Sequence, residues 1–289
     1  MLENIFTKYY SNYGVLYDYE VIFMAIFAFD MDGTLYDHST KRIPDSAMFA
    51  LDNLKAQGHT VGVATGRNMR QLKKAVDPSF FDFLILVNGG YAEVNGKPLK
   101  TVAFSKEQKN RLCDYFDETN ITYSVSTKEK LIAVNPNDKD LIRVINKYQV
   151  PTPDQLDNLR ETDALQFCTY EKKELIYPKI KHFEGEFILH SLGDYGYDIV
   201  LPTIDKGTMF KEVAKFLGFN MKDSYAFGDS DNDAEFLSIA GTGVAMKNGT
   251  PKTISSADMV TTEVYNDGIY VGIQRLGFIK KDYSKISEL

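Results

Sequence analysis

The chain has 289 residues, of which 44% are hydrophobic, 25% charged and 13% aromatic. This composition is that of a folded globular protein, and it excludes a disordered chain, a fibre and a small disulfide-stapled domain. Its 40 acidic and 33 basic residues give a net charge of −7, so the chain lacks the overall positive field with which proteins bind nucleic acid or anionic membranes. Cys113 and Cys168 are the two cysteines, too few for a disulfide framework or a CxxC metal site.

The N-terminal segment, residues 1–23, precedes the first natural strand, which starts near Met24. The apolar run Val21–Phe29 has nine residues, roughly half the length of a membrane span. Acidic residues precede this run and Asp30 follows it, without the basic start or cleavage site of a signal peptide. We therefore expect a cytoplasmic protein, in which residues 1–23 are a peripheral leader or lie before the true start.

Short apolar strands alternate with amphipathic helices at both ends of the chain. This alternation of strands and helices is typical of a parallel sheet covered by helices on both faces. We expect strands over residues 25–29, 60–64, 83–87, 197–201, 225–227, 243–246 and 259–260, and helices over 45–56, 68–76, 206–217 and 265–276. The sequence therefore predicts an α/β fold with a doubly wound, mostly parallel, Rossmann-like core sheet.

The pattern changes after residue 88. Asn95-Gly96, the strongest short hairpin signal, is flanked by Tyr91–Val94 and by the residues after Gly96, and more isolated strands alternate with helices up to about residue 195. We interpret this middle part as an inserted α+β domain of residues 89–195. The core would then be discontinuous and consist of residues 24–88 and 196–289.

The first chemical motif is Asp30-Met31-Asp32-Gly33, directly after the first predicted strand. In open α/β sheets the ligand crevice lies at the carboxyl ends of the strands, so Asp30 and Asp32 face the expected site. One carboxylate can act as nucleophile and the other as general acid and base, while Gly33 lets the backbone turn and expose N–H groups to an anion. Taken alone, the same residues are also typical of an ordinary strand-end turn.

Two further motifs lie where predicted helices begin. Thr65-Gly66 combines a hydroxyl with the free N–H groups of a helix start, which can hold a phosphate, although the same pair also caps ordinary helices. Lys206 opens a helix at its N-terminus, where the helix dipole disfavours a cation. A nearby anion would explain this lysine, whereas a lone lysine is otherwise solvated surface.

A fourth motif, directly after the predicted strand 225–227, concentrates carboxylates. Asp229, Asp231 and Asp233 fall within five residues, which is costly unless a cation neutralises them, and all-oxygen ligands favour Mg²⁺. A calcium loop starting at Asp229 would need Gly and Glu where the chain has Ala234 and Ala240, so that interpretation is excluded.

In this order, the four motifs resemble those of the haloacid dehalogenase-like hydrolase superfamily. The insert between the second and third motifs resembles the large cap of its Cof-type branch. The resemblance covers nearly the whole chain from Met24 onward. It departs at Ser230-Asp231, where the branch often has Asn and Glu, and at Gly90, where it often has Ala.

The resemblance implies a phosphoric monoester hydrolase in which Asp30 attacks phosphorus to form an aspartyl-phosphate. Asp32 would protonate the leaving alcohol and then activate water. Mg²⁺ would be held by the Asp30 carboxylate, the Asp32 backbone carbonyl and Asp229. The phosphate-binding residues implied are Gly33, Thr65, Gly66, Lys206 and Asn232; Asp233, with Asn232, would orient Lys206 or support the metal from behind.

We expect a small phosphorylated metabolite as substrate, either a sugar phosphate or a phosphorylated cofactor. We expect no nucleic-acid or membrane partner, and a monomer or weak homo-oligomer. The sequence does not show which cap residues contact substrate; His38 and His190 are expected to be solvated, and the tyrosines of the insert to serve packing. The alternatives are a sugar phosphomutase and a non-catalytic protein that binds a phosphometabolite, although binding alone does not need Asp32.

Overall fold

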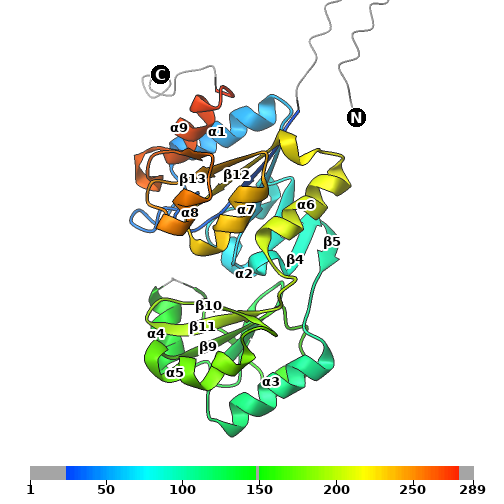
Figure 1. The fold of residues 1–289 in the computed structure, drawn as a ribbon, viewed down its shortest axis with the longest axis vertical. Helices are drawn as coiled ribbons and strands as arrows, with labels where there is room; N and C mark the ends of the chain where they lie inside the picture. Colours follow the sequence, from blue (N-terminus) through cyan, green and yellow to red (C-terminus); the bar gives the residue numbers. More distant parts are fainter. Residues whose placement is uncertain (1–23, 148–149, 280–289) are drawn as a thin grey trace, which may run out of the picture.

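The computed structural model describes residues 24–147 and 150–279, so the predicted leader of residues 1–23 lies outside the described residues. The described chain forms two β-sheets, each with its own helices, one above the other along the long axis (Figure 1). Among the described residues, no helix combines the length and apolar character needed to cross a bilayer.

The upper, core sheet has eight strands in the order β14-β13-β12-β1-β2-β3-β4-β5. Neighbouring strands from β14 to β3 run parallel, and β4 and β5 extend the sheet antiparallel. The strands are β1 (Ile26–Phe29), β2 (Thr60–Ala64), β3 (Phe83–Leu86), β4 (Tyr91–Val94), β5 (Lys97–Thr101), β12 (Ser224–Gly228), β13 (Thr242–Ala245) and β14 (Met259–Val260). The predicted mostly parallel α/β core is confirmed.

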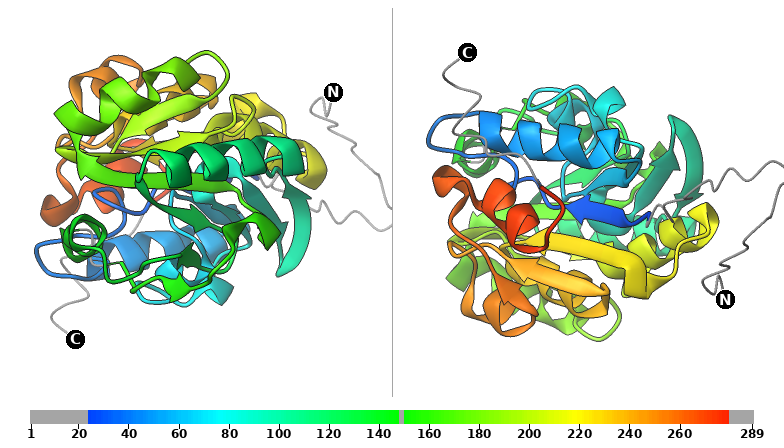
Figure 2. Two further views of the ribbon diagram at one scale, coloured as in Figure 1. Left: turned by 90° about the horizontal axis from the view of Figure 1, so that it is seen from below. Right: turned by 90° about the horizontal axis from the view of Figure 1, so that it is seen from above.

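Helices cover both faces of this sheet because its central strands are apolar on both sides (Figure 2). In β1, Phe27 and Phe29 pack toward α1 and α9, while Ile26 and Ala28 pack toward α6 and α7. The helices are α1 (Asp45–Ala56), α2 (Met69–Leu72), α6 (Lys206–Leu217), α7 (Ala234–Ile239), α8 (Pro251–Ser255) and α9 (Gly268–Arg275).

Helices α1 and α6 have the predicted bounds, whereas α2 is shorter than the predicted 68–76. Asn68 caps the start of α2 in a capping box with Gln71. Beyond Leu72 the chain continues only as turns, with Ala75 N–H bonded to Leu72 at 2.9 Å, before it reaches Pro78. The apolar spacing that predicted a longer helix is therefore satisfied by turns that lead into the next strand.

The lower sheet has six strands in the order β10-β11-β9-β6-β7-β8. Its elements are α3 (Lys106–Glu118), β6 (Thr122–Ser126), β7 (Leu131–Ala133), α4 (Lys139–Lys147), β8 (Asp154–Gln155), β9 (Gln166–Lys172), α5 (Lys173–Ile180), β10 (Ile188–Ser191) and β11 (Tyr195–Val200). Helices α3 and α5 share one apolar cluster on one face of this sheet, and α4 packs into a separate cluster with Cys168 and Tyr170. We call this second body the cap.

Sheet membership differs from the predicted boundaries at residues 89 and 195. The predicted hairpin exists as β4 and β5, but β4 pairs with β3, so the hairpin belongs to the core sheet. Strand β11, predicted to resume the core, pairs with β9 in the cap. An apolar strand pattern does not specify its pairing partner, and by sheet membership the chain enters the cap after Thr101 and leaves it after Val200.

Candidate active site

Three neighbouring parallel strands of the core end at one edge of the sheet. Asp229 follows β12, Asp30 follows β1 and Thr65 follows β2, and these strands are adjacent in the order β12-β1-β2. Residues that lie up to about 200 positions apart in sequence are thus brought together by the register of parallel strands. The predicted position at the carboxyl ends of the strands is therefore where the structure places them.

Lys206, the first residue of α6, is buried between two carboxylates. Its Nζ lies 2.6 Å from Asp30 Oδ1 and 2.7 Å from Asp233 Oδ1, and its side chain is only 2% exposed. Burial alone would lower the pKa of Lys206, but the carboxylates of Asp233 and Asp30 more than offset it and raise that pKa. The nearby anions that explain a lysine at a helix start are therefore the carboxylates of Asp30 and Asp233.

Asp30, Asp229 and Asp233 form the acidic cluster of the site. Each offers a carboxylate oxygen, and these oxygens lie within 4.8 Å of one another. Burial, strengthened by Asp233, raises the pKa of Asp229 to about 7, and burial also raises the pKa of Asp30. Three carboxylates beside one ammonium leave a net negative charge, which fits a hard divalent cation such as Mg²⁺.

Gly33 lies directly against this cluster. Its φ is +85°, and a Cβ there would lie 2.3 Å from Asp229 Oδ2. We predict that Gly33→Ala displaces Asp229 and strongly weakens Mg²⁺ binding, measured by calorimetry. Gly96→Ala is the matched control, since Gly96 has a φ of +71° and an added Cβ would meet nothing within 4 Å. Both variants lose about 1 kcal/mol of stability because alanine disfavours a positive φ, but only the Cβ of Gly33→Ala clashes with Asp229. Equal Mg²⁺ affinity in both variants would contradict the prediction that Asp229 binds Mg²⁺.

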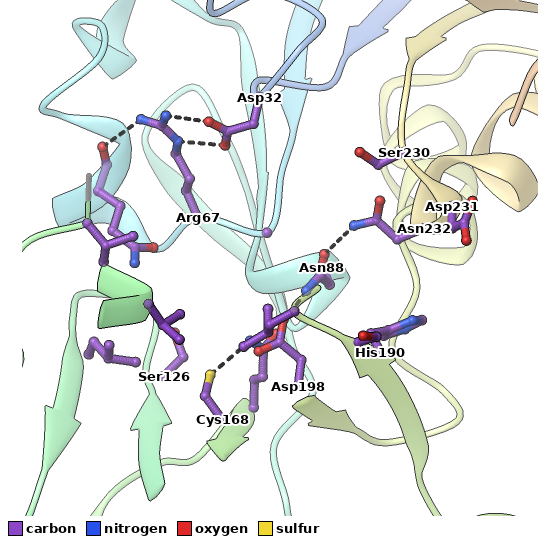
Figure 3. Close-up of a pocket in the computed structure, with 18 of the residues that line it drawn as sticks. Asp32, Arg67, Asn88, Ser126, Cys168, His190, Asp198, Ser230, Asp231 and Asn232 are labelled. Atoms are coloured by element: carbon purple, nitrogen blue, oxygen red, sulfur yellow. Dashed lines mark hydrogen bonds and ion pairs between the residues drawn. The ribbon is translucent and has the colours of Figure 1, made fainter. Parts of the chain in front are cut away.

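Asp32 is not part of the acidic cluster, and its carboxylate points toward Arg67 (Figure 3). The guanidinium of Arg67 donates two hydrogen bonds, at 2.8 Å to Oδ2 and 2.6 Å to Oδ1, and His38 Nε2 lies 2.9 Å from Oδ1. Burial would raise the pKa of Asp32, but hydrogen bonds from Arg67 and His38 lower it well below its usual range. His38 is an exposed turn residue, as predicted, and it is also a partner of Asp32.

A chain of amide hydrogen bonds connects the core to the cap (Figure 3). Asn232 Nδ2 donates to Asn88 Oδ1 at 3.0 Å, and Asn88 Nδ2 donates to Gln166 Oε1 at 2.8 Å. Among the described residues, no hydrogen-bond donor reaches the buried Oδ1 of Asn232. The amide of Asn232 therefore holds the cap to the core rather than contacting Lys206.

The remaining predicted residues surround the same site. Thr65 is buried, and its Oγ1 accepts from the backbone N–H of Arg67 at 3.1 Å. Gly66 packs against Asn88, whose Oδ1 would lie 3.1 Å from an added Cβ. Asp231 is exposed and accepts from Thr250 Oγ1 at 2.6 Å, outside the acidic cluster.

A cavity of about 620 Å³ opens between the two sheets. The core contributes Asp30, Asp32 and Lys206 to its wall, and the cap contributes polar residues and an apolar surface from several of its strands and α4. A nucleophile candidate and a buried cation therefore line one concave site, with the rest of the acidic cluster beside Asp30 and a second domain over it. This arrangement is typical of an enzyme active site.

A family model described as haloacid dehalogenase-like hydrolase matches residues 27–273. The chain belongs to the haloacid dehalogenase-like hydrolases. The predicted resemblance is thereby confirmed, and the matched region of this hydrolase includes both the core and the cap.

Relatives of this hydrolase are named as phosphatases. YkrA of Bacillus subtilis (strain 168), named as a candidate phosphatase, is 29% identical over 87% of this chain and 97% of its own length. The phosphoglycolate phosphatase of Nitrosopumilus maritimus is 28% identical over 86% and 95% of the two chains. With the family match, these relatives confirm the predicted enzyme class, a phosphoric monoester hydrolase.

Solved structures share the whole architecture. A protein from Geobacillus kaustophilus HTA426 superposes with a TM-score of 0.82 at 28% identity, covering 89% of this chain and all of that one. The sugar phosphatase BT4131, of subclass IIB of the superfamily, superposes with a TM-score of 0.77 at 21% identity and covers 88% of this chain. The latter supports the fold of this hydrolase with its cap.

Sequence reasoning missed several residues of this hydrolase's site. Arg67 and Asn88 line the cavity, and neither has a role among the residues predicted from the sequence. Asn248, whose Nδ2 donates to the Gly33 carbonyl at 2.8 Å, had no signal at all. Arg67 and Asn88 follow β2 and β3, so the rule that identified Asp30 would have identified both if applied to every strand end.

Proposed function

We propose that this hydrolase is a Mg²⁺-dependent phosphatase that acts on a small phosphorylated metabolite through an aspartyl-phosphate on Asp30. The observation that carries the proposal is the buried Lys206, which lies 2.6 Å from Asp30 at the wall of the cavity. A buried ammonium beside a carboxylate can hold an incoming phosphoryl oxygen while the carboxylate attacks phosphorus.

The remaining groups divide between the phosphate and the cation. Backbone N–H groups of Gly33 and Gly66 and the hydroxyl of Thr65 would bind phosphoryl oxygens. Asn232, which lines the cavity, would also bind them. The residues that would hold Mg²⁺ are Asp30, Asp229 and the backbone carbonyl of Asp32, with Asp233 behind them. When bound, Mg²⁺ neutralises the charge of these carboxylates and of the phosphate.

Asp32 would donate a proton to the leaving oxygen and then take one from water. With Arg67 and His38 bonded to it, Asp32 is held as a carboxylate, which suits a base but not an acid. If the guanidinium turns to the substrate phosphate, His38 still lowers the pKa of Asp32, but burial raises it and Arg67 no longer opposes burial, so the pKa rises. We therefore propose that substrate binding, by drawing Arg67 away, prepares Asp32 for protonation.

The test is release of inorganic phosphate from a panel of phosphomonoesters, with Mg²⁺ and with a chelator. We expect turnover that the chelator abolishes and Mg²⁺ restores. Transfer of phosphate to a second sugar in place of release would identify a phosphomutase. Binding of metabolites without any release would identify a non-catalytic protein. Either result would overturn the proposed phosphatase.

A further inference from the structure

The cap presents a polar face of its sheet to the cavity. Side chains alternate between faces along a strand, so Gln166, Cys168 and Tyr170 of β9 share one face. All three line the cavity, whereas Phe167, between them, packs into the apolar cluster beneath α3 and α5. The alternation of side chains along β9 therefore places these three polar residues on the face of the cap sheet that lines the cavity, opposite Asp30 in the core.

Asp198 of β11 lies on this face, in register with Cys168 (Figure 3). It is the one Asp, Glu, Lys or Arg that the described part of the cap contributes to the cavity wall. No Lys, Arg or His nitrogen of the described residues comes within 4.0 Å of its carboxylate. Burial raises the pKa of Asp198 to about 7, against hydrogen bonds from Cys168 and Gln166. The cap thus holds a half-buried carboxylate without a cationic partner.

Two polar neighbours of Asp198 on β9, Gln166 and Tyr170, are already engaged within the protein. Gln166 accepts from Asn88 at 2.8 Å and donates to Cys168 Sγ at 3.3 Å. The hydroxyl of Tyr170 shares a hydrogen bond of 2.7 Å with Ser124. Gln166 and Tyr170 therefore have little capacity left for the several hydroxyls of a sugar, whereas the carboxylate of Asp198 has acceptor positions beyond those that Cys168 and Gln166 use.

The cavity wall next to this polar row is apolar. Leu131 of β7 and Val144 and Ile145 of α4 line it, and all three belong to the cluster that packs against Cys168 and Tyr170. A leaving group that fills the cavity therefore meets hydrocarbon on one side and a polar row on the other. In this row Asp198 is the one carboxylate from the described part of the cap, and His190 is its neighbour across the strands. This combination suits a flat or hydrocarbon body that carries one positively charged donor.

We propose that Asp198 binds a protonated amine of the leaving group, and that the preferred substrates are phosphomonoesters of amine-bearing molecules with a largely apolar body. The inference rests on the proposed phosphatase function and specifies its substrate class. An ammonium is the cationic partner that the carboxylate of Asp198 lacks, and a hydroxyl at the same place forms a weaker hydrogen bond.

Matched substrates test the inference. Pyridoxamine 5′-phosphate and pyridoxine 5′-phosphate differ by an amine against a hydroxyl on one carbon. We expect kcat/KM, measured as phosphate release with Mg²⁺, to be about tenfold or more higher for the amine. Asp198→Asn and Asp198→Ser should abolish this preference. Asp194→Asn is the control, since Asp194 is an exposed acid near the start of β11 that does not line the cavity, and it should keep the preference.

The outcomes separate this inference from the proposed function. Equal kcat/KM for both substrates in the unaltered protein, with Mg²⁺-dependent release from an aryl phosphate intact, would overturn the inference and leave the phosphatase standing. A preference that survives in a folded Asp198 variant would overturn the role of Asp198. If neither substrate is turned over, calorimetric affinities of the Asp30→Asn protein decide: tighter binding of the amine supports the inference, and equal or absent binding overturns it.

Discussion

Replacement of Asp30 by Asn is expected to lower Mg²⁺-dependent hydrolysis of an aryl phosphate by about 10³-fold or more. The amide keeps the shape of the side chain but has no anionic oxygen to attack phosphorus. Lys206 still finds Asp233, 2.7 Å from its Nζ, so the buried ammonium is not left without a partner. Phosphate release under saturating Mg²⁺ measures the loss, and activity close to that of the unaltered protein would contradict the nucleophile.

The same substitution is expected to preserve or raise the thermal stability of the metal-free protein. Burial raises the pKa of Asp30, which means that the fold disfavours its ionised form, and Asp233 and Asp229 add repulsion. An amide at this position removes that repulsion. Asp52→Asn, an exposed change on α1, is the control and should alter neither activity nor melting temperature. A large drop in the melting temperature of Asp30→Asn would instead identify Asp30 as a structural partner of Lys206.

Local signals explain which elements were predictable. Helix α1 ends where Gly58 stops it, and α6 begins at its Asp205 cap and ends at Gly218, which has a φ of +82°. These signals lie within a few residues of the boundaries that they set. The pairing of β4 with β3 and of β11 with β9 depends instead on contacts between distant segments, which an apolar pattern does not encode.

The same distinction applies to the site. Asp30, Thr65 and Asp229 were predictable as a group because each follows a strand and parallel strands end at one edge. The two hydrogen bonds from Arg67 to Asp32 depend on side-chain conformations, which the spacing of residues along the sequence does not determine. Asp198 required both the fold of the cap and its position over the core, so no motif in the sequence points to it.

Mg²⁺ is expected to raise the melting temperature by about 5 °C or more at about pH 8, and by little at about pH 5. Burial and Asp233 raise the pKa of Asp229 to about 7 from 3.8. Between these two values the folded protein holds a proton that the unfolded chain has lost. The stability of the metal-free protein therefore falls as the pH rises through this window, and is lowest above pH 7.

Mg²⁺ reverses this loss because it binds the ionised carboxylates, so its stabilising effect grows as the pH rises. Asp229→Asn should abolish the effect of Mg²⁺ on the melting temperature. It should also weaken the dependence of the metal-free protein's melting temperature on pH. Asp231→Asn, which alters an exposed neighbour bonded to Thr250, should keep both. Thermal unfolding across this pH range, with Mg²⁺ and with a chelator, measures all three proteins. A Mg²⁺ effect that persists in Asp229→Asn would place the cation elsewhere than at the cluster of Asp30, Asp229 and Asp233.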